Sequence, residues 1–304
     1  MLSISAMFMR LNLQFAKPFA RFSDIAAARA GQDALGKISA RVLKTVVNYT
    51  DVAFDRFTAC FATPVECTTA QTHAILYLHG GGYTAGELDY ARGFGGVLAA
   101  ATHINTLCVA YRLAPEHKHP AAVDDALTAY RYLLEKGYAP EHIAFVGESA
   151  GGGLAFCLAL RCRDEGIPLP CCIGGISPWT DLTLSGNSYS NNVHRDPSLI
   201  RESLAYYALV YAAGSETKST VSPVFGEFTG FPPVMLFAGG SEILLDDSRT
   251  LYQKLLDAGC EAHLHVEPHM WHVYPLYGLP ESKRAVKRLT EFVLEKLGIG
   301  ETHA

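Results

Sequence analysis

From about residue 70 onward, short apolar runs alternate with longer amphipathic ones, and this alternation constrains the fold more than any other feature of the sequence. Short apolar runs bounded by turn residues are typical of buried strands, whereas longer runs with an apolar stripe are typical of helices. Strands that alternate with helices favour a mostly parallel central sheet with helices on both faces. We therefore expect an α/β fold whose functional groups lie in loops at the carboxyl ends of the strands.

The predicted strands are residues 74–78, 106–110, 143–146, 172–176, 234–238 and 262–266. The predicted helices are residues 121–136, 150–164, 199–211, 248–258 and 282–297. Residues 1 to about 50 and a stretch around 183–215 interrupt the alternation, and their positions suggest a lid over the strand ends.

Composition narrows the class of protein further. The chain is 49% hydrophobic, enough to bury a sizeable core, and its formal charge is −5 without any basic run. These values argue against a partner that is nucleic acid or an anionic membrane surface. No uncharged apolar stretch is long enough to predict an integral membrane segment.

The first 20 residues are apolar but are interrupted by Arg10 and Lys17, and they lack the pattern of a secretory leader. Such a segment could cover a pocket or touch a membrane, and we favour a first helix packed on the body. The eight cysteines form no C-x-x-C pair, and several, such as Cys108, lie in apolar runs. This pattern predicts small buried side chains in a reducing cytoplasm and no metal cluster.

A candidate nucleophile follows the predicted strand at 143–146. Gly147-Glu148-Ser149-Ala150-Gly151 fits G-x-S-x-G and is followed by a run that favours a helix. The motif requires this strand–turn–helix context, because a sharp turn leaves the serine hydroxyl exposed at the edge of the sheet. We predict that Ser149 is the nucleophile of an acyl-transfer reaction.

A glycine-rich loop follows the predicted strand at 74–78. It reads His79-Gly80-Gly81-Gly82, and no phosphate-loop lysine follows it. Consecutive glycines can direct backbone N–H groups toward an oxygen that becomes negative. We predict that Gly81 and Gly82, together with Ala150 after the nucleophile, form an oxyanion hole, and that His79 supports the loop.

The general base is expected late in the chain, since this fold orders its triad as serine, acid and histidine. His263 and His265 alternate within a strand-like run and are expected to be structural, whereas His269 and His272 lie in the loop after it. Location in this loop therefore favours His269 and His272 as candidates for the base.

The acid is expected in the loop after the strand at 234–238, where Glu242, Asp246 and Asp247 are all candidates. Each could orient the imidazole of the base. Asp246 and Asp247 could instead cap the helix that begins there.

The sequence resembles the hormone-sensitive-lipase-like carboxylesterases, mainly the bacterial branch, over roughly residues 70–297. Four blocks carry the resemblance: His79 to Tyr83, Tyr111 to Glu116 with His119 to Ala122, Gly147 to Gly152, and Ser177 to Leu182. The resemblance implies an α/β-hydrolase fold and hydrolysis of short-acyl esters without metal or organic cofactor. It also implies cap helices over residues 1–50 and a catalytic domain over 51–304 with a cap insertion around 183–215.

The resemblance also narrows the triad. His272-Val273-Tyr274 resembles the family's His-x-Phe context, so His272 is the predicted base. The family's acid is usually the first Asp of Asp-Pro-Leu-x-Asp, and the matching run here is Glu242-Ile243-Leu244-Leu245-Asp246. Glu242 is therefore the predicted acid, in place of the usual Asp, and Asp246 is the second choice.

Five aromatic residues are predicted to contact the substrate, namely Tyr83, Trp179, Tyr189, Tyr206 and Tyr207. Helical spacing of Tyr207 and Tyr211 favours plain packing as the alternative. The predicted function is a cytoplasmic serine carboxylesterase acting on a small apolar ester, and family analogy allows a homodimer. The alternatives are a lactone or other acyl hydrolase on the same triad, and a non-catalytic small-molecule receptor.

Overall fold

The computed structural model describes residues 2–20, 24–66 and 72–299, so Cys67 lies outside the described residues. Its centre is an eight-stranded sheet with the order β1-β2-β4-β3-β5-β6-β7-β8. The strands are β1 (Val47–Ala53), β2 (Thr58–Pro64), β3 (Ala74–Leu78), β4 (Asn105–Ala110), β5 (Ile143–Glu148), β6 (Cys172–Ile176), β7 (Val234–Gly239) and β8 (Ala262–Glu267). The strands from β3 to β8 run parallel, and β2 runs antiparallel to both of its neighbours.

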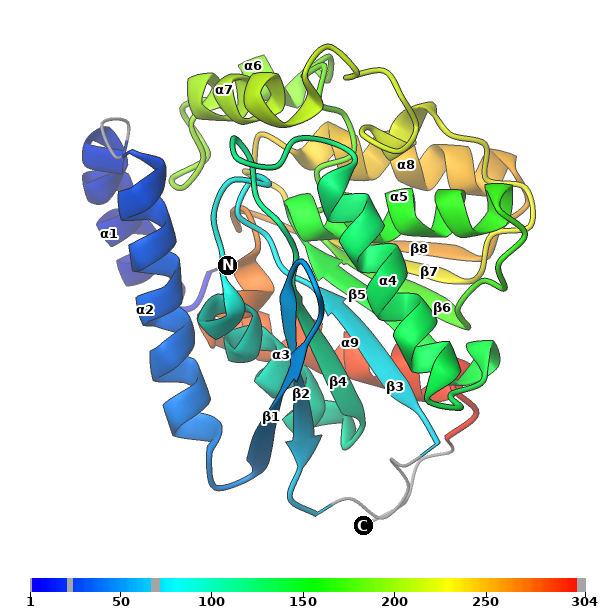
Figure 1. The fold of residues 1–304 in the computed structure, drawn as a ribbon. Helices are drawn as coiled ribbons and strands as arrows, with labels where there is room; N and C mark the ends of the chain where they lie inside the picture. Colours follow the sequence, from blue (N-terminus) through cyan, green and yellow to red (C-terminus); the bar gives the residue numbers. More distant parts are fainter. Residues whose placement is uncertain (1, 21–23, 67–71, 300–304) are drawn as a thin grey trace.

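Helices cover both faces of the sheet (Figure 1). They are α1 (Ile4–Ala20), α2 (Ile25–Leu43), α3 (Leu88–Thr102), α4 (Ala121–Glu135), α5 (Ala150–Asp164), α6 (Ser188–Asn191), α7 (Arg201–Ala212), α8 (Leu245–Asp257) and α9 (Pro280–Lys296). One core lies between the sheet and α4, α5 and α8, and the other lies between the sheet and α3 and α9. Central strands such as β3 are buried along their whole length, which explains their unbroken apolar runs.

The six predicted strands correspond to β3 to β8, but the sequence interpretation did not predict β1, β2 or α3. Strand β1 lies at the edge and is largely exposed, so it carries no clear apolar alternation. Helix α3 contacts its neighbours closely through glycines, a residue type that normally indicates a loop in a sequence. A Cβ added to Gly95 would lie 2.1 Å from Cys108 Sγ, so a larger residue at this position requires the helix or Cys108 to shift.

The boundary predicted at residue 50 can be compared with the position of the first strand. Residue 50 lies within β1, which pairs with β2 along its whole length, so the sheet already begins at Val47. Helices α6 and α7 occupy the predicted insertion between β6 and β7. In Figure 1 they lie over the upper end of the sheet, and α1 and α2 lie along its side.

Helix α1 packs on the body through its two cations. The Arg10 guanidinium donates to the carbonyls of His269 (2.7 Å) and Arg195 (2.6 Å), and Lys17 Nζ donates to the Asp196 carbonyl at 2.6 Å. The first segment is therefore attached to loops near β8 and α6, as the favoured interpretation predicted. Among the described residues, no helix has the length and apolar character required to span a bilayer.

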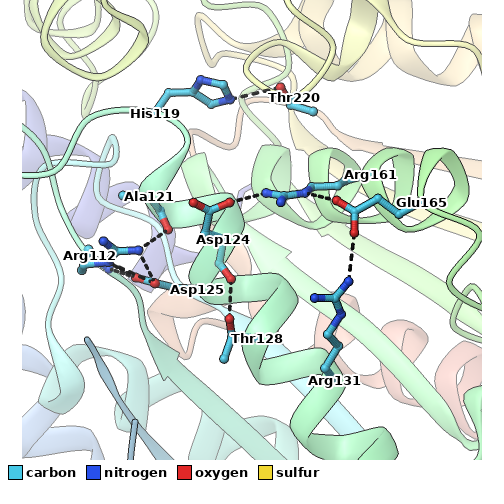
Figure 2. Close-up of polar contacts among 10 residues, drawn as sticks. All are labelled: Arg112, His119, Ala121, Asp124, Asp125, Thr128, Arg131, Arg161, Glu165 and Thr220. Carbon is cyan, nitrogen blue, oxygen red and sulfur yellow. Dashed lines mark hydrogen bonds and ion pairs between the residues drawn. The ribbon is translucent and has the colours of Figure 1, made fainter. Parts of the chain in front are cut away.

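A polar network joins α4 to α5 and to the loop after β4 (Figure 2). Arg161 of α5 pairs with Asp124 and with Glu165, and Arg131 of α4 also reaches Glu165. Beside this network, Arg112 pairs with the buried Asp125 at 2.7 Å. These contacts fix where α4 begins and how the chain leaves β4.

Candidate active site

The nucleophile turn joins β5 to α5. Ser149 has φ 54° and ψ −123°, a strained conformation for a residue with a side chain, and it immediately precedes the first turn of α5. Neighbouring backbone makes this turn tight: a Cβ on Gly151 would lie 2.1 Å from the Leu78 carbonyl oxygen. The second glycine of the motif is therefore required by close packing against the end of β3.

A histidine from the loop after β8 reaches this serine. His272 Nε2 lies 2.8 Å from Ser149 Oγ, which is hydrogen-bonding distance, and both side chains are largely buried. The other late histidines lie elsewhere. His263 approaches Glu261 at 3.5 Å, His265 stacks on Phe237, and the carbonyl of His269 accepts from Arg10. Of the four histidines considered, the structure brings His272 to the serine.

An acidic side chain lies on the far side of the His272 ring. Glu242 Oε2 lies 3.4 Å from His272 Nδ1, an ion-pair distance longer than a normal hydrogen bond. Ser177, at the end of β6, links the two loops, because its hydroxyl donates to Glu242 Oε2 (2.7 Å) and accepts from the Val273 N–H (3.0 Å). The carboxyl is fully buried, and this burial raises its pKa, while the nearby His272 ring and the hydrogen bond from Ser177 lower it.

The other two acid candidates have different partners. Asp246 accepts from the Ser188 N–H at 2.9 Å and pairs with Arg249 at 3.3 Å. Buried Asp247 accepts from the N–H groups of Thr180 and Asp181 at 2.9 and 2.8 Å. Neither side chain caps α8, so the capping prediction is wrong. Both carboxylates instead secure the chain that follows β6.

The glycine loop after β3 lies directly beside the nucleophile. A Cβ on Gly80 would lie 3.0 Å from Ser149 Cβ, and Gly81 has φ 115°, a conformation that favours glycine. Within the described part of the chain, the N–H groups of Gly81, Gly82 and Ala150 donate to no protein acceptor. Burial lowers the pKa of His79 to about 4, so its ring is neutral and supports the loop by donating to the Gly80 carbonyl at 2.7 Å.

A cavity of about 930 Å³ lies between α2 and α7. Its lining includes Tyr206 and Tyr207, two of the residues predicted to contact substrate, and the acidic side chains Asp33, Glu87 and Glu202. The ring of Tyr207 also packs against the glycine loop, since a Cβ on Gly82 would lie 2.6 Å from it. Tyr207 therefore links this cavity to the loop beside Ser149.

The other three predicted substrate residues are packing residues in this structure. Tyr83, Trp179 and Tyr189 are fully buried and lie outside the cavity lining. Tyr83 stacks on Tyr211 with ring centroids 3.8 Å apart. The backbone N–H of Trp179 donates to the Ser149 carbonyl. These buried side chains therefore pack beneath the residues that line the site.

Sequence reasoning missed three residues that organise the site: Tyr111, Glu148 and Ser177. Each belongs to a block that carried the family resemblance, at the start of Tyr111 to Glu116, inside the serine motif, and at the start of Ser177 to Leu182. Their roles depend on hydrogen bonds to residues distant in the sequence, such as Gly80 for Glu148 and Glu242 for Ser177, which a motif does not indicate.

Comparison with known proteins agrees with this geometry. A family profile described as alpha/beta hydrolase fold matches residues 75–276. An acetyl-hydrolase of Streptomyces hygroscopicus is 38% identical over 244 residues, 79% of this chain and 82% of that relative. An esterase of Acinetobacter venetianus is 32% identical over 232 residues, 75% of this chain and 77% of the relative.

The fold has close counterparts among solved structures. An esterase from the bacterial hormone-sensitive lipase family superposes with a TM-score of 0.88 at 31% identity, covering 98% of this chain and 100% of that one. The chain therefore belongs to the α/β-hydrolase family, and within it to the bacterial esterases of the hormone-sensitive-lipase type. It is a carboxylic-ester hydrolase.

Proposed function

We propose that this protein hydrolyses short-acyl carboxylic esters through an acyl-enzyme formed on Ser149. The observation that carries the proposal is the 2.8 Å contact between Ser149 Oγ and His272 Nε2 at a strained strand–helix turn. A nucleophile and base at this distance, with an acid behind the base, can activate a hydroxyl that is otherwise a weak nucleophile. The acetyl-hydrolase relative supports a short acyl group.

Acylation follows from these positions. His272 Nε2 takes the proton as Ser149 Oγ bonds to the ester carbonyl carbon, and the carbonyl oxygen becomes an oxyanion. The free N–H groups of Gly81, Gly82 and Ala150 stabilise that charge. Protonated His272 then gives its proton to the alcohol oxygen as the carbon–oxygen bond breaks.

Deacylation repeats these steps with water. His272 takes a proton from water, whose oxygen bonds to the acyl carbon, and then returns the proton to Ser149 as the acid leaves. Glu242 stabilises the imidazolium in both halves through the 3.4 Å contact with Nδ1. Buried Glu242 is ionised in this role, so activity requires a pH above its raised pKa.

We assign the cap role to α1, α2, α6 and α7, with Tyr206 and Tyr207 as the substrate contacts. The position of the cavity between α2 and α7 supports this assignment. Cytoplasmic residence and pairing into a homodimer remain predictions. The described cysteines are all free thiols, which supports a reducing compartment.

The test is acid release from p-nitrophenyl esters of increasing acyl length, measured for wild type and for Ser149→Ala. Rapid cleavage of acetyl and butyryl esters, falling with chain length, is expected. The serine variant should be slower by several orders of magnitude. Turnover near wild type in Ser149→Ala would contradict the proposal, and release only from lactones would change the substrate class.

A further inference from the structure

Glu148, the variable residue of the serine motif, is a buried carboxyl to which the reaction above gives no role. Its side chain is fully enclosed, and burial raises its pKa to about 7. Oε1 accepts from the Gly80 N–H at 2.6 Å and Oε2 accepts from the Tyr77 hydroxyl at 2.7 Å. A carboxyl bonded only by uncharged donors is costly to bury, so this position calls for an explanation beyond packing.

The peptide unit that Glu148 contacts is also bonded at its opposite end. The Tyr111 hydroxyl donates to the His79 carbonyl at 2.6 Å, and this carbonyl shares one planar peptide unit with the Gly80 N–H. Tyr111 is itself well fixed. Its ring stacks on His79, and the next residue, Arg112, is bonded through its N–H (2.8 Å) and guanidinium (2.7 Å) to Asp125 (Figure 2).

The next two peptide units are fixed in turn. The Gly80 carbonyl accepts from His79 Nδ1 at 2.7 Å, and the Gly81 carbonyl accepts from the Ala85 N–H at 3.0 Å. Because C=O and N–H point in opposite directions in a trans peptide, these two bonds set the directions of the Gly81 and Gly82 N–H groups. A glycine loop has no side chains of its own to hold it, so its orientation depends on the first, doubly bonded unit.

We propose that Glu148 is a positioning residue for the oxyanion hole, holding the Gly80 N–H while Tyr111 holds the other end of the same peptide. Glu148 immediately precedes Ser149, so the segment that carries the nucleophile also carries the carboxyl that holds the Gly80 N–H. This link sets the distance between Ser149 Oγ and the N–H groups of Gly81 and Gly82. The inference rests on the proposed acyl-enzyme reaction.

The test compares Glu148→Leu, Glu148→Gln and Tyr111→Phe with wild type, using p-nitrophenyl butyrate and a trifluoromethyl ketone that forms a tetrahedral oxyanion on serine. Tyr130→Phe is the matched control. Tyr130 lies on α4, away from the site, and its hydroxyl also donates to a backbone carbonyl, that of Pro168 at 2.8 Å. Circular dichroism and thermal melting verify folding.

Glu148→Leu and Tyr111→Phe should lower kcat by about 10- to 100-fold with KM nearly unchanged, because displaced donors stabilise only the transition state. Inhibition by the ketone should weaken by the same factor. Glu148→Gln should retain kcat to within about fivefold, since its amide oxygen still accepts from Gly80. Tyr130→Phe should keep wild-type kcat.

Near-wild-type kcat in a folded Glu148→Leu protein would overturn the proposal. So would a loss in Glu148→Gln as large as in Glu148→Leu, or a loss of kcat without weaker ketone binding. If Glu148→Leu does not fold, Tyr111→Phe decides from the other end of the peptide. Ser149→Ala distinguishes failure of the proposed reaction from failure of the positioning role. If Ser149→Ala is active, the acyl-enzyme reaction itself is wrong. If Ser149→Ala is inactive but the Glu148 and Tyr111 variants keep wild-type activity, only the positioning role is wrong.

Discussion

Glu242 and His272 face each other across 3.4 Å, and Ser177 lies between their loops as a bridge. This arrangement puts a glutamate beside the imidazole, at the position where the family pattern has an aspartate. The longer side chain reaches the imidazole from a loop anchored by its own backbone contacts. The Asn192 side chain donates to the Glu242 carbonyl at 2.9 Å, and Asp196 accepts from the next N–H at 3.0 Å.

The first prediction concerns the identity of the acid. Glu242→Gln should lower kcat/KM by about 1,000-fold or more, because an amide cannot stabilise the imidazolium. Asp246→Asn should stay within about threefold of wild type, since its oxygen still accepts from Ser188. Steady-state kinetics with p-nitrophenyl acetate distinguishes the two, and a larger loss in Asp246→Asn would reverse the assignment.

Ser177→Ala should shift the pH dependence of the reaction. The Ser177 hydroxyl stabilises the charged form of Glu242 and so lowers a pKa that burial has raised. Without that donor the pKa of Glu242 rises further, and the carboxylate is protonated at a higher pH. The acidic limb of kcat/KM should therefore move to higher pH, with activity largely restored on the alkaline side. An unmoved limb in a folded variant would contradict this coupling.

Stability should depend on pH through Glu148. Its pKa rises from 4.5 to about 7 on burial, so its protonated form favours the fold and its contribution is lost as pH rises between these values. The shift sets an upper limit of about 3 kcal/mol on this loss. Because Glu148→Gln cannot ionise, its melting temperature relative to wild type should increase from pH 4.5 to 7 and then level off. A pH-independent difference would show that Glu148 does not titrate in this range.

Arg10 provides a test of how α1 supports the catalytic loop. Arg10→Ala removes the donor to the His269 carbonyl, three residues before His272. We expect a fall in kcat of about three- to tenfold and faster amide exchange over residues 268–273. Asn12→Ala is the control, because among the residues that the structure describes the Asn12 side chain bonds within α1, to the Phe8 carbonyl at 3.0 Å. Equal effects of the two variants would mean that α1 acts only through general stability.

The parallel part of the fold was predictable because its central strands are buried on both faces. Strands such as β3 and β5 are fully buried, and their apolar runs show this directly. The antiparallel edge was not predictable in the same way. Strand β1 alternates weakly, and α3 carries glycines whose role is close contact with the sheet. Those contacts depend on neighbours that are distant in sequence, such as Cys108 beside Gly95.

The same limit applies to the candidate site. Ser149, His272 and Glu242 were predicted from motifs and spacing, and the structure brings these three side chains together. Tyr83 and Trp179 were predicted to face the substrate, but whether an aromatic side chain lines a cavity or fills a core depends on packing between remote segments. Tyr83 is enclosed by Tyr211, which comes from α7.

The most direct test of the central claim is to trap the acyl-enzyme. Wild-type protein mixed with a slowly deacylated p-nitrophenyl ester and quenched within milliseconds should show a burst of p-nitrophenol and one added acyl mass, located by peptide mass spectrometry at Ser149. Ser149→Ala should show neither. Hydrolysis without any adduct at Ser149, or an adduct on another residue, would contradict the account.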